Sequence, residues 1–374
     1  MEMVNRKMIC PSYVSRFRCD GQDCRSRCCR GWGIEVDDGT YDRFEALPEG
    51  KELLSGIYFH EEKQKWLTKH REDGSCIFLD ADLLCTLQKR YGEAMLSNIC
   101  HEYPRVTYEI SDFAEQSMAL SCPVAAKEIL LDKSPMRFTE QEIFPEQRLH
   151  FWKKPRHMEA WQGHFLTLQK LCIRILQERA VPIPDRLERL GRFLGRLEER
   201  AGDGEWKLSE ENISLCFEQI HSMALQETAL TEQEAWQDLV SMSMLLSDLY
   251  ERPYSEEKAS ELAEALLPFL PLYEQNLQEY SYLLENYLVN EFFLRLYPFA
   301  FKGSFADNFR MLDLRFHIME FSMLVMVSAK KRLLTQTQML ELVDRAVELL
   351  DHNPRCMKRL QELTIPDPER STHR

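Results

Sequence analysis

Hydrophobic and polar positions change their spacing about one third of the way along the chain. From about residue 155 onward, apolar residues such as Trp161, Phe165, Leu168 and Leu171 recur at intervals of three and four, which is the period of an amphipathic helix. This period predicts helices over 158–179, 186–200, 208–227, 231–250, 255–269, 274–297, 304–332, 335–352 and 354–363. The C-terminal part is therefore predicted to be an all-α helical domain with a frayed, polar tail.

The first third of the chain has a mixed pattern. Two extended runs, 105–110 and 113–120, flank the Ser111-Asp112 turn and predict a hairpin that leads to Cys122 and Pro123. Segment 53–70 fits either a loosely amphipathic helix or a hairpin. The fold class that follows is mainly α, with a cysteine-rich α+β metal- or cluster-binding region over 1–135 and an all-α helical domain over 136–374.

Composition and charge narrow the class of protein. The 374 residues are 44% hydrophobic and 29% charged, which is typical of a globular protein with two or three cores. A net charge of −14 disfavours a nucleic-acid partner, which needs a basic face. No apolar run has the length of a signal peptide or a membrane span, so we expect a cytoplasmic protein that does not enter a membrane.

Cysteines are concentrated in the N-terminal third. Of the twelve in the chain, eight form the ordered group Cys19, Cys24, Cys28, Cys29, Cys76, Cys85, Cys100 and Cys122. Because cytoplasmic thiols stay reduced, metal ligation is favoured over disulfides. Four or more of the eight are candidate metal ligands. Cys172, Cys216 and Cys356 lie in helical patterns and are expected in the core.

The spacing favours an iron–sulfur cluster over zinc without excluding zinc. Four thiols within eleven residues, with a distant Cys122 to complete the shell, are typical of cluster ligation. A zinc ribbon would show two tight pairs, and only Cys24 with Cys28 forms one.

Arginines surround the same loop. Guanidinium groups offset the negative charge of a cluster with four thiolates, and Arg27, Arg30 and Arg105 are the candidate cofactor-binding residues. The alternative is a solvated basic face.

Several motifs resemble those of the bacterial flagellin lysine-N-methylases. They are CDGQDCRSRCCRGW at 19–32, CIFLD at 76–80, CHEYPR at 100–105 and SCPVAA at 121–126. A second block, with ENYLVN at 285–290 and YPF at 297–299, is weaker. The resemblance implies an S-adenosylmethionine-dependent lysine N-methyltransferase that acts on flagellin and carries a [4Fe–4S] cluster held by the cysteines.

Methyl transfer to lysine requires a neutral amine, so a nearby side chain must accept its proton. His101, Glu102 and Tyr103 are the candidate catalytic residues, and Tyr108 is a further candidate. The ordinary interpretation is that they are surface, hydrogen-bonding or packing residues. No Gly-rich strand-to-helix turn marks a methyl-donor site.

A polar stripe in the helical part also has two interpretations. Glu285, Asn286, Asn290 and Glu291 recur at helical spacing, which favours a solvated face or a domain contact over a donor-binding surface. For the whole chain, the alternatives to the methylase are a non-catalytic zinc- or iron-binding interaction protein and a redox sensor.

Overall fold

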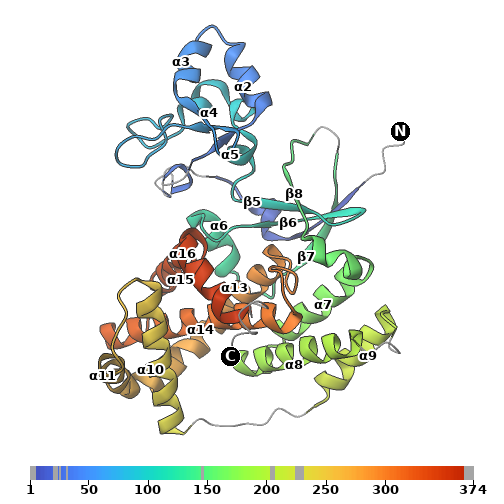
Figure 1. Ribbon diagram of the computed structural model, residues 1–374, viewed down its shortest axis with the longest axis vertical. Helices are drawn as coiled ribbons and strands as arrows, with labels where there is room; N and C mark the ends of the chain where they lie inside the picture. Colours follow the sequence, from blue (N-terminus) through green and yellow to red (C-terminus); the bar gives the residue numbers. More distant parts are fainter. Residues whose placement is uncertain are drawn as a thin grey trace. The chain divides into compact units, whose positions relative to one another are not determined.

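The chain folds into two compact units. The computed structural model describes residues 6–19, 24, 27–30, 33–144, 147–202, 207–223 and 231–365. Unit 1 comprises Met1–Glu128 and Arg137–Lys154, and unit 2 comprises Ile129–Met136 and Pro155–Arg374. Helices make up most of the described residues, which confirms the mainly α class (Figure 1). The frayed tail predicted for the C-terminus lies outside the described residues.

Unit 1 contains a five-stranded sheet with the strand order β7-β1-β6-β5-β8. Its strands are β1 (Lys7–Pro11), β5 (Arg105–Glu109), β6 (Phe113–Met118), β7 (Phe138–Glu142) and β8 (Phe151–Lys153). Strands β5 and β6 form the antiparallel hairpin that the sequence predicts. β1 runs parallel to β6 and antiparallel to β7, and β8 runs parallel to β5, so three of the four pairings join distant segments.

A smaller sheet in unit 1 resolves the alternative left open for 53–70. Here β2 (Glu35–Val36), β4 (Lys65–Thr68) and β3 (Ile57–His60) form a three-stranded sheet in the order β2-β4-β3. Segment 53–70 is therefore the end of a helix followed by a hairpin. The short helices are α1 (Tyr13–Arg16), α2 (Asp38–Glu45), α3 (Gly50–Ser55), α4 (Thr86–Tyr91), α5 (Asn98–Glu102) and α6 (Pro123–Leu130).

Asp37 connects two of these helices. Its carboxylate caps α2 by accepting the Thr40 N–H at 3.1 Å, and it also accepts the Asn98 N–H at the start of α5 at 2.8 Å. An aspartate at the N-terminus of a helix satisfies backbone donors that have no partner within the helix. This side chain thereby fixes the position of α5, which carries Cys100.

Unit 2 is helical, and most of its helices lie close to the predicted ranges. An exception is the predicted helix 158–179, where Arg156–His164 is a 3-10 helix and the α-helix begins at Phe165. The unit contains α7 (Phe165–Leu176), α8 (Ile183–Ala201), α9 (Glu210–His221), α10 (Glu232–Leu249), α11 (Glu256–Leu266), α12 (Leu270–Glu279), α13 (Ser281–Leu294), α14 (Phe305–Lys330), α15 (Gln336–His352) and α16 (Pro354–Thr364). The predicted helix 274–297 is two helices that meet at Tyr280. No helix in the described ranges is long and apolar enough to cross a membrane.

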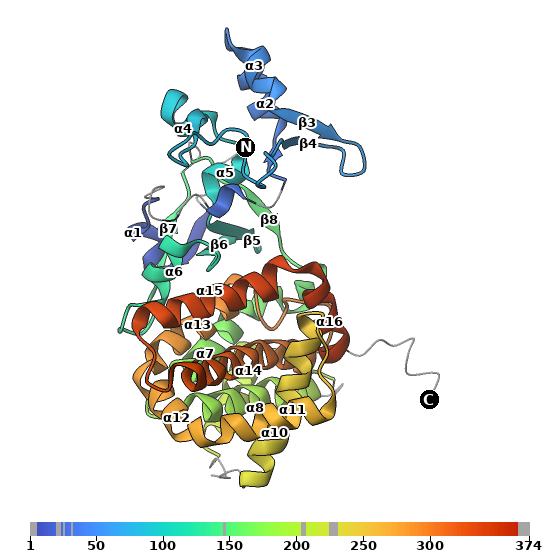
Figure 2. The same cartoon turned by 90° about the vertical axis from the view of Figure 1, so that its left-hand side faces the viewer.

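Helix α14 is the centre of unit 2. It packs against α8, α10, α11, α12, α13, α15 and α16, and Figure 2 shows it surrounded by them. Gly191 of α8 allows the closest approach, because a Cβ atom there would lie 2.6 Å from the Phe309 ring of α14. Gly195, one turn further along α8, has open space around it.

Helix α13 is buried on every side, so the first interpretation of its polar stripe as a solvated face is wrong. Glu285, Asn286, Asn290 and Glu291 are each at most 1% exposed. Buried charges are tolerated when they are paired, and these carboxylates have arginine partners. Arg315 donates to Glu291 at 2.9 Å and to Asp351 at 2.7 Å.

Candidate metal centre and its surroundings

Short backbone pairings bring the cysteine segments together in unit 1. The Cys76 N–H donates to the Cys29 carbonyl at 2.8 Å, which joins the Cys28-Cys29 turn to the segment around Cys76. Isolated β-bridges pair Arg30 with Ser75 and Leu79 with Cys85. Main-chain hydrogen bonds therefore bring together the segments that carry Cys28 and Cys29, Cys76, and Cys85.

Three further cysteines sit at helix starts. Cys85 immediately precedes α4, Cys122 precedes α6, and Cys100 lies in the first turn of α5, where its N–H donates to the Ser97 hydroxyl at 3.3 Å. N–H groups at a helix start favour a thiolate over a thiol. In line with this, N–H groups of Val124 and Ala125 act to lower the Cys122 pKa.

Burial is nevertheless the larger effect on these thiols. It raises the pKa of Cys100 to about 12 and that of Cys122 to about 11, and it raises the Cys76 and Cys85 pKa values as well. Ionised neighbours reinforce the effect, because a Cys28 thiolate repels charge on Cys85, Cys100 and Cys122. At neutral pH these side chains are thiols, and a bound cation would have to displace their protons.

Cys28 is the common neighbour of the group. Its Sγ lies 3.7 Å from Sγ of Cys29, and this contact lowers the Cys28 pKa and raises that of Cys29. Negative charge on Cys76 or Cys100 also raises the pKa of Cys29, and negative charge on Cys24 raises the pKa of Cys122. Of the eight predicted ligands, Cys28, Cys29, Cys76, Cys85 and Cys100 thus form a cysteine group, with Cys122 and Cys24 at its edge. Cys19 is exposed.

The donor set of this cysteine group fits a soft metal. Thiolate sulfur selects zinc, copper(I) and iron–sulfur clusters over hard cations. Among the described residues, no three His, Cys, Asp or Glu side chains are arranged as a metal site, so binding a metal would require these side chains to move. The 3.7 Å separation of Cys28 and Cys29 matches the edge of roughly 3.8 Å expected for a tetrahedral site with Zn–S bonds of ~2.3 Å.

The predicted arginines have different surroundings. The side chain of Arg27 lies outside the described residues. Arg30 is exposed and helps to keep the Asp73 pKa low, behind the larger effect of hydrogen bonds from Ser75. The Arg105 guanidinium lies over the Phe17 ring, 5.1 Å from its centroid. The neighbours that the structure gives these two arginines are therefore Asp73 for Arg30 and Phe17 for Arg105.

Arg71 was missed by the sequence analysis. Its guanidinium donates to the Ile77 carbonyl at 3.1 Å and to the Leu79 carbonyl, and its charge acts to lower the Cys76 pKa. It follows a hairpin strand in a charged turn, HREDGS, which carries no recognisable motif. Only the folded chain places it next to the cysteines.

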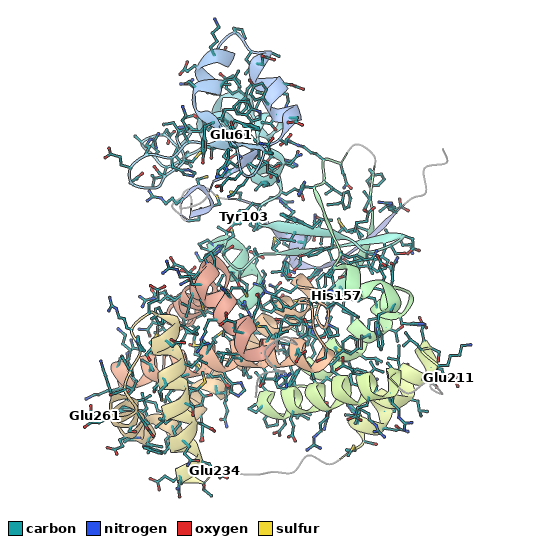
Figure 3. The ribbon with its side chains drawn as sticks, viewed as in Figure 1. Glu61, Tyr103, His157, Glu211, Glu234 and Glu261 are labelled. Carbon is teal, nitrogen blue, oxygen red and sulfur yellow. The ribbon has the colours of Figure 1, made fainter. Side chains whose placement is uncertain are left out.

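The candidate catalytic residues lie at the end of α5. Glu102 is 7% exposed, and burial raises its pKa to about 7, although Arg105 and Arg148 oppose the shift. Burial likewise lowers the His101 pKa. Tyr103, labelled in Figure 3, has its hydroxyl 3.1 Å from the hydroxyl of Ser121, the residue before Cys122 in the sequence.

His101 and Glu102 directly follow Cys100 in the sequence, and Tyr103 contacts the residue before Cys122. His101 Nδ1 and Glu102 Oε2 are buried without a hydrogen-bond partner in the described part of the chain. Tyr108 lies on β5, opposite Glu115 of β6. The remaining cysteines, Cys10, Cys172, Cys216 and Cys356, are buried.

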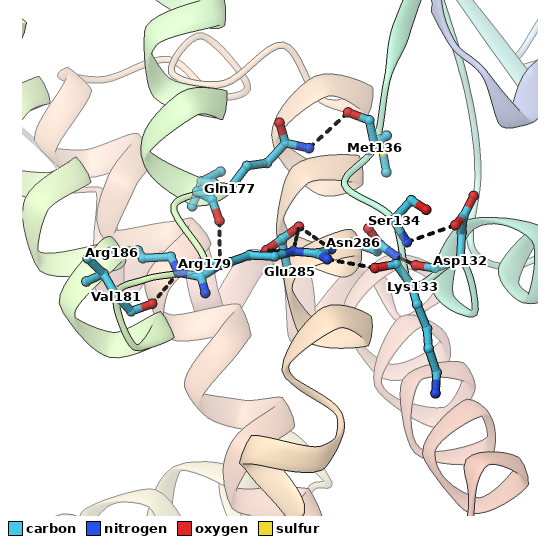
Figure 4. A network of polar contacts seen from close by, with 11 residues as sticks. Asp132, Lys133, Ser134, Met136, Gln177, Arg179, Val181, Arg186, Glu285 and Asn286 are labelled. Atoms are coloured by element: carbon cyan, nitrogen blue, oxygen red, sulfur yellow. Dashed lines mark hydrogen bonds and ion pairs between the residues drawn. The ribbon is translucent and has the colours of Figure 1, made fainter.

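Unit 2 contains a separate ionic network around Glu285 of α13. Arg179 donates to its carboxylate at 2.9 to 3.1 Å, and Arg186 donates at 2.8 Å (Figure 4). The neighbouring Asn286 donates its amide to the Asp132 carbonyl at 2.7 Å. The weaker sequence block at 285–290 thus joins α13 to α8 and to the 129–136 segment of the same unit.

A sequence model of the FliB lysine N-methylase C-terminal domain matches residues 169–365, which is more than half of the chain. The chain belongs to the FliB lysine N-methylase family. The matched range begins within α7 and ends after α16, so this family domain is the helical part of unit 2.

Similar proteins carry names of the same kind. The Lysine-N-methylase of Salmonella typhimurium is 30% identical over 142 residues, which are 36% of this chain and 35% of that protein. The Lysine-N-methylase of Salmonella choleraesuis matches to the same extent. The Flagellar biosynthetic protein FliU of Salmonella muenchen is 29% identical over 140 residues, which are 83% of that protein. No solved structure matches.

The alignment spans about a third of the two lysine methylases' own length. Family membership is established by the C-terminal domain.

Proposed function

We propose that the protein is a lysine N-methyltransferase that transfers the methyl group of S-adenosylmethionine to lysine side chains of flagellin. The supporting observation is the match of residues 169–365 to the lysine N-methylase C-terminal domain. The names of the similar Salmonella proteins, lysine methylase and flagellar biosynthetic protein, support the same substrate. We place the protein in the cytoplasm.

The transfer is a single displacement. The lysine ammonium first loses a proton, and the lone pair of the neutral amine then forms a bond to the methyl carbon while the carbon–sulfur bond breaks toward sulfur. We propose that the polar side chains next to Cys100 receive that proton. Glu102 is the first candidate because its Oε2 is buried and without a partner in the described residues. His101 and Tyr103 flank it.

We further propose that the cysteine group holds a [4Fe–4S] cluster, with Arg27, Arg30 and Arg105 as candidate cofactor contacts. When bound, the cluster would cross-link the segments around Cys28, Cys76, Cys85 and Cys100 and compensate their thiolate charge. Zinc is the alternative, favoured by the 3.7 Å separation of Cys28 and Cys29. A zinc protein without methyl transfer would be an interaction module.

Two measurements test the proposal. Purification without oxygen, followed by iron, sulfide and zinc analysis, decides the metal, and about four irons and four sulfides per chain are expected. Incubation with flagellin and S-adenosylmethionine carrying an isotopically labelled methyl group is expected to label lysines, as read by mass spectrometry. Absence of labelled lysine with a fully loaded protein overturns the transferase. Glu102→Gln is expected to slow transfer without loss of metal.

A further inference from the structure

His70 lies directly opposite Cys76 in a short antiparallel pairing. The Arg71 N–H donates to the Ser75 carbonyl at 2.8 Å, and the Ile77 N–H donates to the Lys69 carbonyl at 3.0 Å. These two bonds flank the His70–Cys76 pair, which is therefore a non-hydrogen-bonded pair. In such a pair the two Cα atoms are about 4.5 Å apart and the side chains project to the same face. The imidazole and the Cys76 thiol therefore project to the same face of this pairing.

The His70 ring has a buried nitrogen with nothing to bind. Nε2 is closed off from solvent and has no hydrogen-bond partner among the described residues. A buried polar atom without a partner is unfavourable, and native structures contain few of them. The register with Cys76 puts the ring on the face that also carries that thiol, so a metal held by the cysteines is a candidate for the missing partner.

A metal ion suits this position better than a water molecule. Metal–nitrogen bonds are about 2.0–2.1 Å long, much shorter than a contact to water. An atom that water does not reach can therefore still coordinate a metal held by neighbouring thiolates. Imidazole is a good ligand for both zinc and iron, and a mixed set of cysteines and histidine occurs for each.

We propose that Nε2 of His70 is a ligand of the metal held by the cysteine group. This inference rests on the proposed function, because it needs the metal proposed there. Neutral imidazole in place of a thiolate removes one negative charge from the site. For an iron–sulfur centre, this lower negative charge raises the reduction potential. His70 is absent from the sequence motifs and is identified by its register with Cys76 alone.

The test is pulsed electron paramagnetic resonance on full-length protein grown with ¹⁵N-histidine. If the metal is iron, the reduced cluster is examined, and if it is zinc, the protein is reloaded with cobalt(II). We expect a strong ¹⁵N coupling that is lost in His70→Ala. His60→Ala is the matched control, because His60 lies on β3 and its Nδ1 accepts the Lys63 N–H at 3.4 Å. A chelator should remove metal from His70→Ala at least about tenfold faster.

The outcomes separate this inference from the proposed function. A wild-type protein that binds metal but shows no histidine coupling overturns the ligand role of His70 and leaves the methylase intact. A wild-type protein that binds neither iron nor zinc overturns the metal centre and His70 together. The labelled wild-type measurement does not depend on whether His70→Ala folds. His70→Cys provides a second variant that keeps a ligand there and is expected to retain metal without the coupling.

Discussion

Replacing Glu285 with alanine is expected to destabilise unit 2 strongly. The carboxylate is 1% exposed and receives hydrogen bonds from two arginines, of which Arg186 is itself only 4% exposed. Removing one member of a buried ion pair leaves the other charge unpaired, at about 3–5 kcal/mol. Arg179 is 36% exposed and turns to water, and Arg186 keeps two backbone carbonyls. We therefore expect the lower end, about 3 kcal/mol.

Urea unfolding followed by far-ultraviolet circular dichroism measures this change. With a slope of about 2–3 kcal/mol per molar urea, a loss of 3 kcal/mol lowers the midpoint by about 1–1.5 M. Glu188→Ala is the control, since its pair with Arg192 on α8 is exposed and contributes about 0–1 kcal/mol. Adding Arg186→Met to Glu285→Ala should recover part of the loss, because it removes the unpaired charge. A Glu285→Ala midpoint equal to that of Glu188→Ala would refute the reasoning.

Three further tests, which use five substitutions in all, have signs fixed by the structure, and each is read from the same unfolding curves. Gly191→Ala forces a methyl group into an α14 ring and should cost about 1–3 kcal/mol, whereas Gly195→Ala, in open space, should stabilise by about 0.5–1 kcal/mol. Tyr287→Phe removes a buried hydroxyl without a partner in the described residues and should be neutral or stabilising, whereas Tyr280→Phe breaks a 3.0 Å bond and should cost about 1 kcal/mol. Burial acts to raise the Asp351 pKa, but Arg295 and Arg315 outweigh it and hold this pKa below its usual value. The stabilisation is complete above the unfolded pKa of about 4 and is lost as the pH falls through the lower folded pKa, so Asp351→Asn should flatten the acid limb.

Local periodicity predicts the helices of unit 2 well, because most of them have one buried and one exposed face. Helix α13 shows where this reasoning ends. Its polar residues have the spacing of a solvated face, yet they are buried, and arginines from α8 and α14 neutralise the two glutamates. Those partners lie 24 and 99 positions away in sequence. A pattern within one helix carries no signal about a counter-charge on another.

The same distinction applies to the sheet of unit 1. The hairpin of β5 and β6 follows from two alternating runs and a turn, all within about fifteen residues. Strand β1 lies more than a hundred residues before its parallel partner β6. Strand β8 pairs with β5 although β6 and β7 lie between them in the sequence. The edge strands β7 and β8, of five and three residues, have too few positions to show a period.

The cysteines combine both cases. Their clustering in sequence, with the family resemblance, was enough to predict thiolate chemistry, but not to tell which thiols meet. That selection comes from three pieces of backbone pairing, at 29 with 76, at 70 with 76 and at 79 with 85. These pairings place Arg71 and His70 beside Cys76, although neither belongs to a cysteine motif. Residues that strand register brings beside a cysteine therefore become visible only when the strands are paired, whereas the clustering of the cysteines can be read from the sequence.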